Sequence, residues 1–149
     1  MNTSSRIAAL FYAVGAVASL ILGSIYLFRT SFMPYHSIAL GKSWGEVGEA
    51  ERILIEALMD VAGAGWLALG CGVLALLWWP FRKGETWARL LIPFMLVLFY
   101  APTLYATIKV LAGTPASPPW WGNALVLALA AAAFLLDRPW IARTQKVSD

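Results

Sequence analysis

Residues 7–28 read IAALFYAVGAVASLILGSIYLF, an unbroken apolar run without a charged side chain. At about 1.5 Å per residue, a helix over this run crosses the roughly 30 Å apolar core of a bilayer. Arg6 precedes the run and Arg29 follows it. A cleaved signal peptide also joins a basic residue to an apolar segment, but that segment is only about 7–15 residues long. We therefore predict an uncleaved transmembrane helix.

The composition of the whole chain agrees with this prediction. Of the 149 residues, 60% are hydrophobic and 13% are charged, and the mean hydropathy is +0.71. An ordinary soluble domain has roughly 25% charged residues. These values exclude a typical soluble globule, a disordered chain and a collagen-like chain. They predict one integral membrane domain over residues 1–149.

Three more apolar runs follow the first, which predicts an all-α bundle of four transmembrane helices. The expected spans are 7–28, 53–79, 88–108 and 120–136, with an outer loop over 29–52 and an exposed tail over 140–149. Ser43 and Glu46 fit a capping box that begins a helix. Pro93 and Pro102 are expected to kink the third span. Ser117, followed by Pro118, is the expected cap of the fourth.

The distribution of basic residues predicts the orientation in the membrane. An even number of spans places both termini on one side, and seven basic residues fall there against four on the other. The seven are Arg6, Arg82, Lys83, Arg89, Arg138, Arg143 and Lys146, and the four are Arg29, Lys42, Arg52 and Lys109. The positive-inside rule therefore predicts cytoplasmic termini in the cell (inner) membrane.

Several classes of site have little support in the sequence. Cys71 and His36 are the only residues of their types. No intrachain disulfide can form, and one chain cannot supply a metal site that needs two cysteines or two histidines. No cofactor is expected. The chain has no run of Lys and Arg, so we expect no nucleic-acid partner.

Two carboxylates in the second span are the strongest candidates for residues of a functional site. Glu56 and Asp60 are four residues apart and share one helix face. A carboxylate in the apolar zone costs on the order of 3 kcal/mol, so it is protonated, paired or beside a wet cavity. One interpretation is a site for a cation, a proton or a polar substrate. The other is an ion pair of Asp60 with Arg29 or Lys109.

Aromatic and polar residues of the third and fourth spans are expected near Asp60. They are Tyr100, Tyr105, Trp120 and Asn123. Together they suggest an outward-facing pocket for a hydrophobic or cationic small molecule. The alternative is an aromatic belt at the membrane surface. His36, in the outer loop, is either a proton-transfer group of the site or a structural residue.

Small residues recur every four positions in three of the spans. The sets are Gly15, Ser19 and Gly23; Ala64, Ala68 and Gly72; and Ala124, Ala128 and Ala132. Such faces allow close helix packing. We expect them either to hold the bundle together or to join protomers of a homo-oligomer.

Parts of the sequence resemble a family of small bacterial four-helix membrane proteins that is functionally uncharacterised. The matching stretches are FMPYH at 32–36, GAGWLALG at 63–70, PFR at 80–82 and WAR at 87–89. The resemblance implies a bacterial origin and a four-helix fold, and no activity. In architecture alone the chain is also similar to the EXPERA group of sterol isomerases and the sigma-2 receptor. No residue of that group is carried over.

Three functions follow as hypotheses. The leading one is a non-enzymatic membrane protein that binds, senses or passes a hydrophobic or cationic small molecule as a homo-oligomer. The second is an enzyme acting on a lipid or isoprenoid, with Asp60 or Glu56 as acid or base and His36 as a partner. The third is a structural or accessory subunit of a membrane complex.

Overall fold

The computed structural model describes residues 1–141, and these residues form only helices and their connections. The four long helices are each long and apolar enough to cross a membrane, as predicted. In chain order the elements are α1 (Thr3–Phe28), α2 (Pro34–Leu40), η1 (Trp44–Glu46), α3 (Glu49–Leu76), η2 (Leu77–Phe81), α4 (Thr86–Gly113) and α5 (Trp120–Asp137). Most of the predicted tail, residues 142–149, lies outside the described residues.

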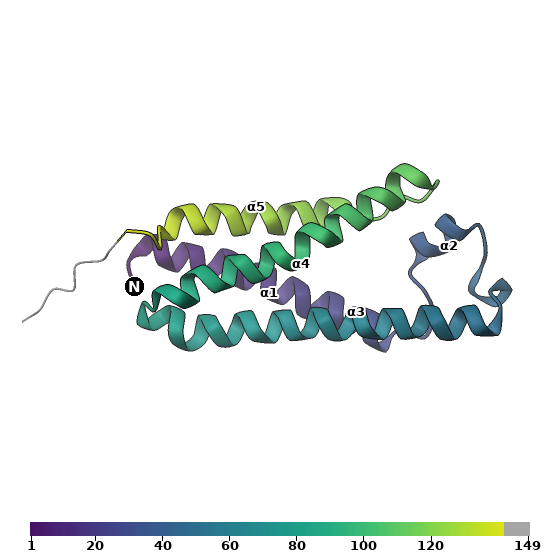
Figure 1. Ribbon diagram of the computed structural model, residues 1–149, viewed down its shortest axis with the longest axis horizontal. Helices are drawn as coiled ribbons and strands as arrows, with labels where there is room; N and C mark the ends of the chain where they lie inside the picture. Colours follow the sequence, from purple (N-terminus) through teal and green to yellow (C-terminus); the bar gives the residue numbers. More distant parts are fainter. Residues whose placement is uncertain (142–149) are drawn as a thin grey trace, which may run out of the picture.

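The long helices lie roughly along one direction, so the bundle has two distinct ends (Figure 1). The N-terminus and the end of α5 lie at one end, here called the terminal end. The other, here called the loop end, carries α2 and η1. The core contains side chains from every long helix, among them Tyr12, Trp66, Leu96 and Val126.

Helices α1 and α3 approach closely because glycines leave room for the opposite backbone. A Cβ atom on Gly63 would lie 2.8 Å from the backbone nitrogen of Leu27 and 3.0 Å from the carbonyl oxygen of Gly23. On Gly70 it would lie 2.8 Å from the carbonyl oxygen of Ala16. Close approach through small residues is the usual way in which membrane helices pack.

The small residues of α1 hold the bundle together, which is one of the two predicted alternatives, whereas Ala64 and Ala68 of α3 do not pack inside it. Gly15, Ser19 and Gly23 are buried, but Ala64 and Ala68 are exposed. On α5, Ala128 is also exposed, and the buried positions are Asn123, Val126, Ala130, Ala133 and Asp137. Spacing identified stripes of small residues, but it could not show which stripe meets a neighbouring helix.

The second span is longer than predicted at both ends. The capping box of Ser43 and Glu46 is present, but it begins η1. The long helix α3 begins at Glu49, after Gly48. At the other end η2 is a π-helical segment that includes Pro80, a residue that cannot donate a backbone hydrogen bond.

The last two spans keep their predicted order and differ in detail. Helix α4 continues through Pro93 and Pro102 as one element. Helix α5 begins at Trp120 with Pro119 as its N-cap, so the expectation that Ser117 caps it with Pro118 at the first position is wrong. At the start of α5, the backbone N–H of Trp120 donates a hydrogen bond to the carbonyl oxygen of Pro118 at 2.8 Å.

Candidate functional site

A cavity of about 260 Å³ lies toward the loop end between α1, α4 and α5, with Tyr35 of α2 and Trp66 of α3 also in its walls. We call it the loop-end cavity. Its walls combine aromatic rings with hydroxyl and amide groups. The lining residues that carry these groups are Tyr26, Tyr35, Trp66, Tyr100, Thr103, Thr107, Trp121 and Asn123. Mostly apolar walls with a few polar groups are typical of small-molecule sites.

Tyr100 is a fixed part of the wall. It is 1% exposed, and its hydroxyl lies 3.0 Å from Ser19 Oγ and 3.2 Å from the carbonyl oxygen of Gly15. Its ring meets Trp66 edge to face, with 4.9 Å between the ring centroids. These contacts join α1, α3 and α4, so the position of the ring is set by the core and not by a ligand.

Asn123 supplies a buried amide group to the wall of the cavity. The residue is 9% exposed, and its Nδ2 donates to Thr107 Oγ1 at 3.2 Å. The Thr107 hydroxyl in turn donates to the carbonyl oxygen of Thr103 at 2.7 Å. Within residues 1–141, Asn123 Oδ1 receives no hydrogen bond. The amide is therefore held in one orientation with an acceptor still available.

A tyrosine pair completes the lining of the cavity. The hydroxyls of Tyr26 and Tyr35 share a short hydrogen bond, and both residues line the cavity. Burial and the hydrogen bond to Tyr26 raise the pKa of the Tyr35 hydroxyl. The Tyr35 hydroxyl therefore stays neutral, and its hydrogen bond to Tyr26 joins α2 to α1 beside the cavity.

The structure brings together two of the seven predicted site residues. Tyr100 and Asn123 both line the loop-end cavity. The other five do not: Glu56, Asp60, Tyr105 and Trp120 are exposed, and His36 lines a different cavity. Sequence reasoning missed Thr107, and it chose Trp120 where the neighbouring Trp121 lines the cavity.

The register of α1 against α3 explains why Asp60 is not part of this site. Gly63 packs against Leu27, and the two helices run in opposite directions (Figure 1). Asp60 lies three residues from Gly63 in the direction of the loop end. It is therefore level with residue 30, just beyond the end of α1 at Phe28. The expected ion pair with Arg29 or Lys109 is not formed in the described part of the chain.

His36 lies in α2 and lines a separate apolar cavity of about 340 Å³, together with Phe32 and Met59. Its Nδ1 accepts a hydrogen bond from the backbone N–H of Met33 at 3.3 Å. Burial, and to a smaller extent the charge of Arg29, lower the pKa of the imidazole. His36 is therefore held neutral as a capping acceptor for α2.

We expect acid to loosen α2. Because the folded pKa of His36 lies below its ordinary value of 6.5, the folded state binds fewer protons than the unfolded state. The stabilising contribution is complete above that value and is lost as pH falls through the folded pKa. Protection of the α2 amides from hydrogen exchange should decrease over this interval. The His36→Phe variant should show lower protection without this pH dependence. If the variant kept the pH dependence of the wild type, neutral His36 would not be the group that stabilises α2.

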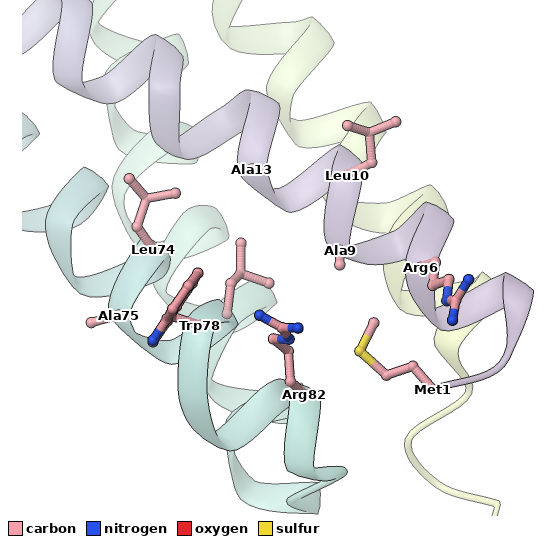
Figure 2. Close-up of a pocket in the computed structure, with 10 residues that line it drawn as sticks. Met1, Arg6, Ala9, Leu10, Ala13, Leu74, Ala75, Trp78 and Arg82 are labelled. Atoms are coloured by element: carbon pink, nitrogen blue, oxygen red, sulfur yellow. The ribbon is translucent and has the colours of Figure 1, made fainter.

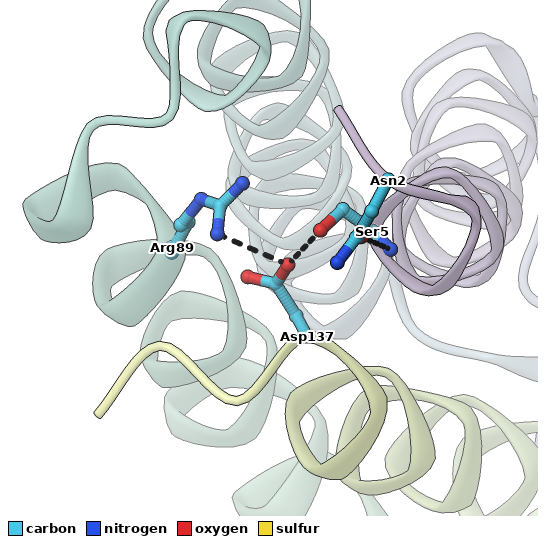
Figure 3. Close-up of polar contacts among 4 residues, drawn as sticks. All are labelled: Asn2, Ser5, Arg89 and Asp137. Carbon is cyan, nitrogen blue, oxygen red and sulfur yellow. Dashed lines mark hydrogen bonds and ion pairs between the residues drawn. The ribbon is translucent and has the colours of Figure 1, made fainter. Parts of the chain in front are cut away.

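A buried ion pair at the terminal end was not predicted. Arg89 Nη1 of α4 lies 3.3 Å from Asp137 Oδ1 at the end of α5, and these side chains are 4% and 1% exposed. Ser5 Oγ of α1 donates to the same carboxylate oxygen at 2.6 Å, and Asn2 caps α1 beside it (Figure 3). The group therefore connects α1, α4 and α5 at one point.

The described residues offer no obvious metal centre. No group of three or more His, Cys, Asp or Glu side chains able to hold an ion occurs between residues 1 and 141. Within the same range, Cys71 is a free, exposed cysteine.

Comparisons with known proteins give no identification. No protein-family model matches the chain, and no curated protein or solved structure is significantly similar to it. The resemblance to small bacterial four-helix proteins and to the EXPERA group therefore stays an expectation.

Proposed function

We propose that this chain is a membrane protein that binds a small neutral molecule in the loop-end cavity. The observation that carries the proposal is the Asn123 amide, held by Thr107 in a largely aromatic cavity with its Oδ1 available. With cytoplasmic termini, as the basic residues predict, the cavity would open toward the outer side of the membrane. Binding there would serve sensing or passage of the molecule.

The residues that line the cavity favour a neutral ligand over a cationic one, although the sequence alone suggested either a hydrophobic or a cationic molecule. Among residues 1–141, no Asp, Glu, Lys or Arg lines the cavity. A cation entering it would lose hydration without gaining a carboxylate partner, which is costly at a buried site. A molecule with an apolar body and one hydrogen-bond donor fits better, because the donor can reach Asn123 Oδ1 while the body contacts Trp66 and Trp121.

A thermal-stability screen tests this proposal. Neutral and cationic compounds of matched size are added to the purified protein, and its unfolding temperature is measured. A ligand that binds only the folded state stabilises it by about 2.7 kcal/mol at a concentration 100 times its Kd. We expect neutral donors to raise the unfolding temperature of the wild type. In the Asn123→Leu variant, the Kd should rise at least about ten-fold, because a hydrogen bond is lost and the cavity is partly filled. The increase in unfolding temperature should be correspondingly smaller.

Tyr105→Phe is the matched control, since Tyr105 is exposed on α4 and does not line the cavity. It should keep the full shift. Equal shifts in wild type and Asn123→Leu would contradict the assignment of the cavity. A selective response to the cationic compounds would contradict the neutral ligand.

The structural or accessory subunit is the second candidate. Glu56 and Asp60 lie on an exposed part of α3, beside the exposed side chains of Leu58 and Val61. A partner or a second copy that covers this face would shield the two carboxylates from lipid. The enzyme hypothesis has less support, because neither carboxylate lines the cavity that His36 lines.

A further inference from the structure

A groove of about 1020 Å³ lies at the terminal end, between α1 and the junction of α3 with η2. Figure 2 shows Ala9 and Ala13 on one side of this groove and Leu74 and Trp78 on the other. We call it the terminal groove. It is separate from the loop-end cavity and shares no lining residue with it.

Two arginines stand at the end of the terminal groove. Arg6 comes from the first turns of α1, and Arg82 follows η2, so the two guanidinium groups flank the groove from opposite helices (Figure 2). Neither forms an ion pair or a side-chain hydrogen bond with the residues that the structure describes. Arg82 lies over the ring of Trp78, 5.3 Å from its centroid, which directs it along the groove wall.

The basic residues around the groove are not equivalent. Lys83 is adjacent in sequence to Arg82, but its ammonium lies 4.0 Å from the centroid of the Trp79 ring, and it does not line the groove. Arg89 is buried against Asp137. Arg6 and Arg82 are thus the two basic side chains that line this groove among the described residues.

We propose that the terminal groove binds one anionic phospholipid of the adjacent leaflet. The phosphate would lie between Arg6 and Arg82, and an acyl chain would follow Ala9, Ala13 and Leu74. Guanidinium groups suit phosphate because their planar N–H groups donate two hydrogen bonds at once. A lipid fits this groove better than a free phosphate, because its acyl chain can contact the apolar walls and a free phosphate has no such part.

The test is native mass spectrometry of the full chain in detergent, titrated with phosphatidylglycerol or with phosphatidylcholine. The wild type should retain phosphatidylglycerol more tightly, with one lipid per chain. Removing one arginine near the membrane surface should weaken binding about five-fold, so Arg6→Gln with Arg82→Gln should weaken it about thirty-fold. Glycerol phosphate, which has no acyl chains, should leave no adduct.

The matched control is Lys83→Gln with Arg138→Gln, which removes the same charge at the same end without touching the groove. It should bind like the wild type. Ala75→Trp, at an exposed position of the groove, should weaken both lipids without a change of charge. Equal losses in the two double variants, or equal retention of the two lipids by the wild type, would overturn the proposal.

Discussion

The Asp137→Ala variant is expected to lose about 3–5 kcal/mol of folding free energy, the cost of removing one partner of a buried ion pair. Asp137 is paired with Arg89 and accepts a hydrogen bond from Ser5, and both charged side chains are almost completely buried. Without the carboxylate, the charge of Arg89 is no longer balanced by this pair. The junction of α1, α4 and α5 should therefore open first.

The loss is measured as the free energy of unfolding by titration with sodium dodecyl sulfate in mixed micelles. Glu85→Ala is the control, because it removes an exposed carboxylate near the same end and should change stability by less than about 0.5 kcal/mol. Replacing the pair together, as Arg89→Met with Asp137→Leu, should recover most of the loss, since apolar residues can replace a buried pair. Equal stability of Asp137→Ala and wild type would show that the pair does not stabilise the bundle.

Gly63→Leu is expected to separate α1 from α3. Even its Cβ atom would lie 2.8 Å from the backbone nitrogen of Leu27 and 3.0 Å from the carbonyl oxygen of Gly23. Backbone atoms cannot rotate away, so the helices must move apart or the variant must not fold. Overpacking alone costs about 1–3 kcal/mol, and the lost contacts along this helix pair add to it.

The separation can be measured by a pair of spin labels on exposed positions of the two helices, such as Val17 on α1 and Ala68 on α3. The distance between the labels should increase in Gly63→Leu. Gly113→Ala is the control, because a Cβ there would meet no atom within 4 Å. It should leave the distance and the stability unchanged. An unchanged distance in a folded Gly63→Leu protein would contradict the packing of α1 on α3.

The four spans could be predicted because an apolar run of sufficient length has few other structures available to it. Their ends were harder: α3 begins four residues before the predicted span, where Glu49 and the caps around it add turns beyond the apolar run. The helical period also assigns residues to a face without showing what that face meets. For this reason Gly63 and Gly70 were not distinguished from Ala64 and Ala68.

The two aspartates show that the sequence pattern also could not predict which polar side chain is buried. Asp60 lies within the second predicted span and Asp137 directly follows the fourth, and only the fold makes Asp60 exposed and Asp137 buried. The partner of Asp137 comes from α4 and the hydroxyl beside it from α1, and no spacing in the sequence joins these positions. Tyr100 and Asn123 were chosen for an expected place near Asp60, and the structure places both in the lining of the loop-end cavity, which Asp60 does not line. Thr107 became recognisable only through its hydrogen bond with Asn123.

The most direct test of ligand binding is native mass spectrometry of the protein taken in mild detergent from the membranes that produce it. We expect a small neutral molecule bound to the wild type and to Tyr105→Phe, and its loss from Asn123→Leu. The Arg6→Gln, Arg82→Gln double variant should keep it, because the terminal groove is a separate site. A bound molecule retained by Asn123→Leu would contradict the assignment of the loop-end cavity as its binding site.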